Sequence, residues 1–330
     1  MSALEVNLLK LYVPLVAWVS LGLVLGYTLP QRIPLQLGKF LFWIGVPVSI
    51  LAFLRQADLS GAVWVAPAAA WAAIALGILL AWLWIKCQTY LHQWHDRNAM
   101  PGWLSKFVGR SSPEFWSRPT QGSFLLSSMV GNTGYLGYPV TLALVGPPYF
   151  AWALFYDTLG STLGAYGVGV AIAARFGMSA QNHWRLLQAI VSNPALWSFF
   201  IGLGFRRVPL PSAVEDGLRL FAWTVVALSL LLLGMRLSQL TSLRSMQQAS
   251  VSLGIKMVLV PLLLGTGLAH IGIHGPPHLV ILLQMGMPPA FATLVIAEAY
   301  NLDRELTVTS LALGTLGLLA MLPIWVWIGR

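Results

Sequence analysis

The chain has 330 residues, of which 57% are hydrophobic and only 9% are charged. Soluble domains carry about 25% charged residues, and so few charges cannot cover a soluble surface of this size. The composition excludes a cytosolic enzyme, a disordered chain and a secreted scaffold held by disulfides, and it indicates an integral membrane protein. The net charge of +9 is thinly spread through apolar runs, so we relate it to membrane topology and expect no nucleic-acid partner.

The apolar runs predict an all-α protein with ten transmembrane helices, because about 20 apolar residues span a bilayer as a helix. In chain order the ten segments are 11–30, 33–54, 61–85, 121–146, 149–174, 186–205, 218–237, 249–270, 277–300 and 306–328. No basic segment precedes the first of them, so we expect a retained helix there. An even number of helices places both termini on one side. Thirteen of the 19 Lys and Arg residues then fall on the cytoplasmic side if both termini are outside, as the positive-inside rule requires.

One long connection, residues 87–120, is expected to be a cytoplasmic loop. Its segment 103–108 has the aromatic and basic pattern of an interfacial helix. His92 and His95 are three residues apart but lack a third ligand type, so we expect no metal site and no cofactor.

The order of the segments indicates an internal duplication. Prolines recur in the first and sixth helices at Pro14 and Pro194, and Gly/Pro breaks recur in the fourth and ninth at 137–139 and 286–289. Two five-helix units, residues 1–175 and 186–330, fit this spacing once the long loop is set aside. An odd number of helices per unit inverts the second unit. Inverted repeats with matching interrupted helices are the sequence pattern of a secondary transporter.

The two interrupted helices are the candidate binding site. Pro139 lacks an N–H, and lipid cannot satisfy the backbone groups that a break leaves open. We expect the half-helix after Pro139, and its counterpart after Pro288 and Pro289, to present N–H groups that attract a carboxylate. A packing kink explains one break equally well, whereas two breaks at matching positions favour a site. The candidate substrate-binding residues are Asn132, Thr133, Gly134, Tyr135, Pro139, Asn193, Gln284, Pro288 and Pro289.

Ionisable residues inside the membrane are the second signal, since they are rare there and mostly functional. Asp157 should lie about 12 Å along the fifth helix, near the midplane, as a coupling or gating residue, with helix packing as the alternative role. We place Glu298 near the cytoplasmic surface, and Lys256 and Arg236 near helix ends, where they can extend to the interface. For Asn193 a hydrogen bond between helices is the alternative to a site role.

Several short motifs resemble the auxin efflux carrier family of membrane transport proteins. They are Gly131–Pro139, Ala143–Gly146, Tyr156-Asp157, Met285–Ala290, Ile296–Asn301 and Ser310–Pro323. The resemblance implies ten helices in two inverted five-helix repeats, with helices four and nine crossing at their proline breaks and one panel moving against a scaffold. By position, Asn132 and Pro139 match the first break of the family and Pro288 the second. Members carry organic anions, which here implies a bacterial-type permease of the inner (plasma) membrane.

The departures from the family pattern bear on the substrate. The third helix, 61–85, has no ionisable residue, and the long hydrophilic loop of large plant carriers is missing. A small mono- or dicarboxylate therefore fits better than auxin, with a proton or a sodium ion as the candidate coupling ion. The predicted function is secondary transport by alternating access; an anion channel or a membrane-embedded sensor on the same fold is the alternative. The chain contains no Ser/His pair and no paired carboxylates within the membrane, so its sequence does not indicate an enzyme. A homodimer is left open.

Overall fold

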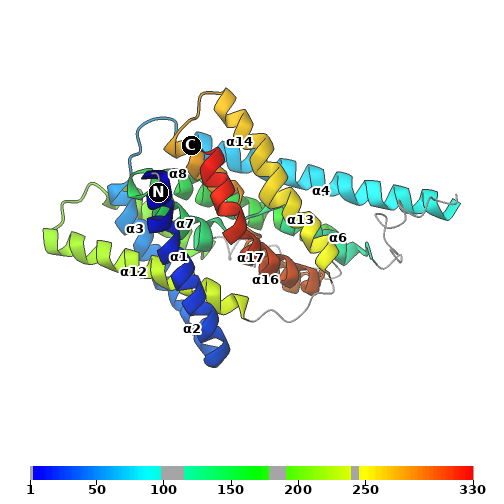
Figure 1. Cartoon of the computed structure of the whole chain (residues 1–330), viewed down its shortest axis with the longest axis horizontal. Helices are drawn as coiled ribbons and strands as arrows, with labels where there is room; N and C mark the ends of the chain where they lie inside the picture. Colours follow the sequence, from blue (N-terminus) through cyan, green and yellow to red (C-terminus); the bar gives the residue numbers. More distant parts are fainter. Residues whose placement is uncertain (1–2, 98–114, 178–190, 239–244, 330) are drawn as a thin grey trace.

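The computed structural model describes residues 3–97, 115–177, 191–238 and 245–329, and the regular structure in these ranges is helical (Figure 1). The first half contains α1 (Ala3–Thr28), α2 (Arg32–Phe40), the π-turn η1 (Leu41–Gly45), α3 (Val46–Gln56), α4 (Val65–Arg97), α6 (Arg118–Met129), the π-turn η2 (Thr133–Gly137), α7 (Tyr138–Leu144), η3 (Pro147–Tyr149), α8 (Phe150–Phe155), the π-turns η4 (Tyr156–Thr162) and η5 (Ala165–Gly169), and α9 (Val170–Phe176).

The second half contains α11 (Pro194–Phe205), α12 (Ser212–Leu237), α13 (Met246–Leu253), the π-turn η6 (Gly254–Leu259), α14 (Val260–His270), α15 (Pro276–Met285), α16 (Phe291–Ala299) and α17 (Arg304–Ile328). Several of these elements run on into one another without a break, as α2, η1 and α3 do.

Six helices in the described ranges are long and apolar enough to cross a membrane. They are Arg32–Gln56, Val65–Tyr90, Pro147–Phe176, Ser212–Arg236, Met246–His270 and Arg304–Ile328. Shorter apolar helices lie at Val16–Thr28, Pro194–Phe205 and Pro276–Met285. All nine fall on segments expected from the sequence; the total of ten crossings and the two inverted repeats stay predictions.

The surface of the molecule is apolar where a soluble protein would be charged. Tyr27, Leu220, Ile271 and Trp327 are each exposed by more than two-thirds of their area. Large apolar side chains in such positions need a hydrocarbon solvent. Together with the spanning helices, this surface defines an all-helical, multi-pass membrane protein.

We call α1, α2–α3, α11 and α12 the first bundle. In it α1 packs along α12, and α3 packs against α11 and α12. The α1–α12 contact is unusually close, because a Cβ atom on Gly234 would lie 2.0 Å from the carbonyl oxygen of Val19. Small residues allow this approach between membrane helices. An ion pair of 2.5 Å between Arg55 and Glu215 joins the end of α3 to the start of α12.

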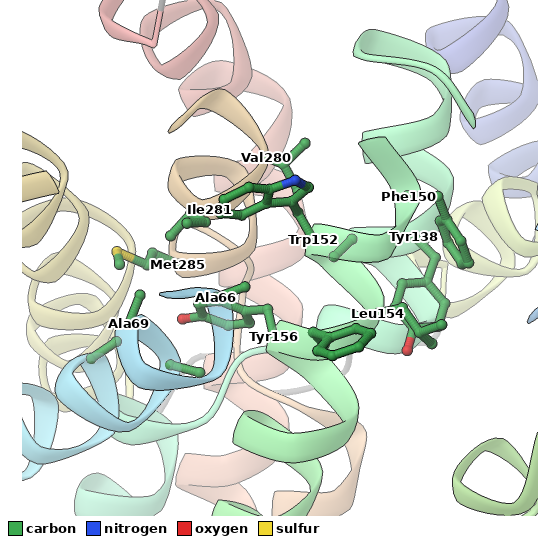
Figure 2. Close-up of a cluster of buried hydrophobic side chains, with 14 of the residues drawn as sticks. Ala66, Ala69, Tyr138, Phe150, Trp152, Leu154, Tyr156, Val280, Ile281 and Met285 are labelled. Carbon is green, nitrogen blue, oxygen red and sulfur yellow. The ribbon is translucent and has the colours of Figure 1, made fainter. Parts of the chain in front are cut away.

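The remaining described helices form the second bundle, in which α4 packs against η4 and α6, and α13 against α17. Figure 2 shows how α8 and η4 fill the space between α4 and α15: Tyr156 lies beside Ala66 of α4, and Trp152 lies beside Val280 and Ile281 of α15. These residues are all buried. The short apolar helix α15 is therefore enclosed by protein instead of facing lipid along its length.

One expected boundary is wrong. The connection after the third helix does not begin at residue 87, because α4 continues to Arg97 and carries His92 and His95. Pro194 lies in the first turn of α11, where proline is well tolerated, and Asn193 is the N-cap of this helix. The expected interfacial helix at 103–108 and the first residues of the segment 186–205 lie outside the described residues.

Candidate functional site

The two broken helices meet at their breaks. α6 ends at Met129 and the chain is extended before η2, while α15 ends at Met285 and α16 begins only at Phe291. The backbone N–H of Asn132 donates to the carbonyl of Pro288 at 2.7 Å, and the N–H of Ala290 donates to the carbonyl of Val130 at 3.0 Å. Residues 130–132 and 286–290 thus form a short antiparallel bridge, centred on Gly131 and Pro289, which we call the crossing.

This bridge explains how two helices can be interrupted in an apolar protein. An unpaired N–H or carbonyl in hydrocarbon costs several kcal/mol, so irregular backbone occurs only where protein or water satisfies it. At the crossing each break supplies partners for the other. The expectation that both helices are interrupted, and that the interruptions meet, is confirmed.

The position of the first break differs from the expected one. The second half of the fourth helix restarts at Thr133, before Pro139, which lies in the first turn of α7. The π-turn η2 makes this arrangement possible, because Gly137 N–H reaches back to the carbonyl of Asn132 and the missing N–H of Pro139 falls near a helix start. Pro288 and Pro289, in contrast, lie within the second break.

Backbone donors gather where the half-helices restart. The Asn132 side chain caps η2, its Oδ1 accepting from the N–H of Tyr135 at 3.2 Å. The first-turn N–H groups of Gly134, Phe291 and Ala292 have no partner among the described residues outside their own helices. Helix N-termini with free N–H groups and a positive dipole end are anion-binding positions. Asn132, Gly134, Tyr135 and Phe291 are all at least partly exposed.

Asp157 holds the restart of the fourth helix. Its carboxylate accepts hydrogen bonds from the hydroxyl of Thr133 and, at 2.7 Å, from the hydroxyl of Tyr138, and its side chain is almost fully buried. A Cβ atom on Gly134 would lie 3.3 Å from Oδ2. The carboxyl group therefore lies beside the N-terminal end of η2, where the helix dipole favours a negative charge. Asp157 contacts the first break directly.

Lys256 also lies at the crossing, and not near a helix end as expected. It is only 1% exposed, and its ammonium donates to the carbonyl of Met285 at 2.6 Å. A Cβ atom on Gly131 would lie 3.3 Å from Nζ, so the charge is also close to the first break. The expectation failed because the helix starts at Met246, which places Lys256 nearly three turns inside. The position of a lysine so far inside an apolar segment was the sequence feature that could have indicated a role at the site.

Gln284 lies behind the crossing in the last turn of α15. It is fully buried, and its Nε2 donates to the hydroxyl of Thr141 at 3.1 Å, while Oε1 has no partner among the described residues. Gly137 makes room for this amide, because a Cβ atom there would lie 2.2 Å from Oε1. In this conformation Gln284 therefore contacts α7 and ties the second broken helix to the first.

The crossing faces the first bundle across an apolar seam. Tyr135 stacks on Phe42 at 6.5 Å, and Arg236, at the end of α12, lies over the ring of Phe291 at 5.0 Å. A cavity of about 20 Å³, room for one water molecule, lies in the seam between Gly134, Tyr138, α3 and α12. Ser49, one of its lining residues, has a buried hydroxyl with no described partner.

Two other predicted residues belong elsewhere. Asn193 caps α11 of the first bundle, its Oδ1 accepting from the N–H of Ala195 at 3.0 Å. Glu298 is about half exposed and pairs with Arg304 at 2.7 Å, which fits the surface role expected for it. In the described part of the chain, no group of three or more His, Cys, Asp or Glu side chains is arranged to hold a metal ion.

Comparisons with known proteins agree with this architecture. Residues 179–326 match the family model described as membrane transport protein. An uncharacterized transporter of Methanocaldococcus jannaschii is 29% identical over 212 residues, which cover 63% of this chain and 68% of the relative. An uncharacterized transporter of Methanothermobacter thermautotrophicus is also 29% identical, over 211 residues and the same shares.

An all-helical membrane protein with two interrupted helices joined at their breaks is thus also similar in sequence to proteins named as transporters. These similarities support the resemblance found in the motifs to the auxin efflux carrier family of membrane transport proteins. They point to a transporter rather than an enzyme.

The hydroxyl contacts of Asp157 predict a measurable coupling. Tyr138→Phe should lower the free energy of unfolding in mixed micelles by about 1–2 kcal/mol, because one hydrogen bond to a buried carboxylate is lost. In an Asp157→Ala background the same change should cost much less, since the partner is already gone. Equal costs in both backgrounds would show that the two side chains do not interact.

Proposed function

We propose that the protein is a secondary transporter that moves a small organic anion, such as a mono- or dicarboxylate, by alternating access. The observation that carries the proposal is the crossing, where η2 and α16 begin within a few residues of the backbone bridge and Lys256 contacts the carbonyl of Met285. Helix N-termini and a cation favour a negative ligand, and interrupted helices are the usual place for it in such transporters.

The candidate ligand contacts differ in kind. Gly134 and Phe291 offer backbone N–H groups, and Asn132 offers its side-chain Nδ2, which has no described partner. Tyr135, which is partly exposed, is a further candidate through its hydroxyl. Thr133, Pro139, Pro288 and Pro289 shape the backbone instead of facing the ligand in this conformation. A carboxylate fits this set because each of its oxygens accepts two hydrogen bonds.

Asp157 gives the proposal its coupling step. An ionised carboxylate beside η2 repels an anion arriving at the same N-terminus, and the repulsion vanishes when Asp157 takes up a proton. Loading of the anion would then require loading of a proton. The hydrogen bonds from Thr133 and Tyr138 equally support a purely structural role, so the two roles need a direct test.

The packing of the helices supports the proposed inverted repeat and a moving panel. Corresponding helices of the two proposed repeats make corresponding contacts. The contact of α1 with α12 corresponds to that of α11 with α3, and the contact of α4 with η4 corresponds to that of α13 with α17. We propose that the first bundle is the scaffold and the second bundle the moving panel, which carries the crossing. The bacterial inner membrane, with both termini outside, remains the proposed location and topology.

Counterflow in proteoliposomes tests the function. Vesicles preloaded with an unlabelled dicarboxylate, for example malate, should transiently accumulate the labelled anion, and the initial rate should saturate with its concentration. An anion channel would give an ohmic current without counterflow, and a sensor would bind the anion without either signal.

Asn132 and Asn193 provide a matched pair of substitutions. Asn132→Ala should weaken binding of the transported anion by about 1–3 kcal/mol, because a polar contact at the crossing is lost. Asn193→Ala removes the same amide from a helix cap in the first bundle and should leave affinity unchanged. Affinity is measured by titration of the purified protein, with yield as the check on folding. Equal affinities for the two variants would contradict a ligand role for Asn132.

Asp157→Asn separates coupling from packing, since it keeps the size and much of the hydrogen bonding, with one acceptor oxygen in place of two, but removes titration. We expect the variant to retain anion counterflow and to lose accumulation driven by a proton gradient. The measurement compares uptake with and without an imposed pH gradient in wild type and variant. A variant that still accumulates the anion in proportion to the gradient excludes Asp157 as the coupling residue.

A further inference from the structure

The ammonium of Lys256 occupies a position with the geometry of a cation site. α15 ends at Met285, and its last carbonyls carry the negative end of its dipole. The N–H groups of Gly286 and Met287 donate to two of them, those of Leu282 and Gln284. Lys256 Nζ lies 2.6 Å from another, the carbonyl of Met285. In transporters with interrupted helices, such half-helix C-termini and unwound carbonyls coordinate the sodium ion.

The charge of Lys256 is not cancelled by an acid. Lys256 forms no ion pair with another described residue, and the buried acid of the crossing, Asp157, is bonded to Thr133 and Tyr138. The side-chain amine donates to the carbonyl of Met285 in a site that is almost closed to solvent. It therefore occupies the position beside this carbonyl that a bound sodium ion would take.

We infer that the ammonium of Lys256 takes the place of a coupling sodium ion, so that the protein carries its own cation at the crossing and binds no sodium there. The inference rests on the proposed transport function, because only a transporter has a coupling ion. A second cation beside the first is disfavoured by like-charge repulsion, which is strong in a buried site. A tethered ammonium also competes at a high effective concentration.

The inference predicts different sodium responses for two substitutions of Lys256. Lys256→Ala removes the charge and leaves room beside the carbonyl of Met285, so the carbonyl end should accept a free sodium ion. Lys256→Met also removes the charge, but an apolar chain of similar length still fills the space. Lys86→Ala is the control, because Lys86 is an exposed lysine on α4.

Thermal unfolding of the purified full-length protein, followed by tryptophan fluorescence, provides the test. NaCl is replaced stepwise by choline chloride at constant ionic strength. The Tm of wild type and of Lys86→Ala should not depend on sodium. Lys256→Ala should unfold at lower temperature in choline and recover by about 4 °C as sodium saturates, because a ligand at 100 times its Kd stabilises the folded state. Lys256→Met should be destabilised without recovery.

Two results would overturn the inference: a saturable, sodium-specific rise in the Tm of wild type, or equal sodium responses of Lys256→Ala and Lys256→Met. If Lys256→Ala does not fold, binding of radioactive sodium to wild type decides the question alone, since saturable binding contradicts the inference and its absence supports it. None of these measurements uses a substrate. A failed counterflow assay would therefore reject the proposed transport function without affecting this result.

Discussion

The constraint on which this structure depends is that a backbone group inside a membrane protein must find its partner within the protein. Interrupting one helix there leaves several N–H and carbonyl groups open. Interrupting two helices at the same place allows residues 130–132 and 286–290 to satisfy each other. The remaining groups follow a rule, because backbone donors gather where helices restart and carbonyls, such as that of Met285, where helices end. The chemistry of the site follows from that separation.

The two buried charges are placed according to the same separation. Asp157 lies beside the restart of the fourth helix and Lys256 beside the end of α15, so each charge faces the pole of a half-helix dipole that favours it. Both residues belong to π-turns, η4 and η6. A π-turn adds a residue to a helix and shifts the side chains that follow it, and such turns are frequent at functional sites. Here they aim a carboxylate and an ammonium at one crossing from two different helices.

The sequence predicted the existence of the site better than its details. Glycine and proline in matching helices were sufficient to predict two breaks, because a continuous helix is poorly compatible with Gly286–Pro289. The family resemblance implied that the two breaks cross. The break before Thr133 could not be placed. The π-helical segment η2 lies between the break and Pro139, and the sequence does not indicate such a segment. Lys256 was missed because its depth depends on where the helix begins, and apolar runs define helix starts only to within a turn. Gln284 was identified, but its direction toward Thr141 depends on packing that sequence spacing does not determine.

The bridge at the crossing has a mechanical consequence. Separating the two broken helices would strip partners from backbone groups in an apolar interior, so the four half-helices should travel as a single rigid body. The seam around Phe42, Tyr135 and the small cavity is different, because it contains a pair of stacked rings and mainly apolar lining residues. The rigid crossing thus lies next to an apolar seam with the first bundle that resists sliding less. In the proposed transport cycle, movement along this seam would leave the spacing of the candidate ligand contacts unchanged.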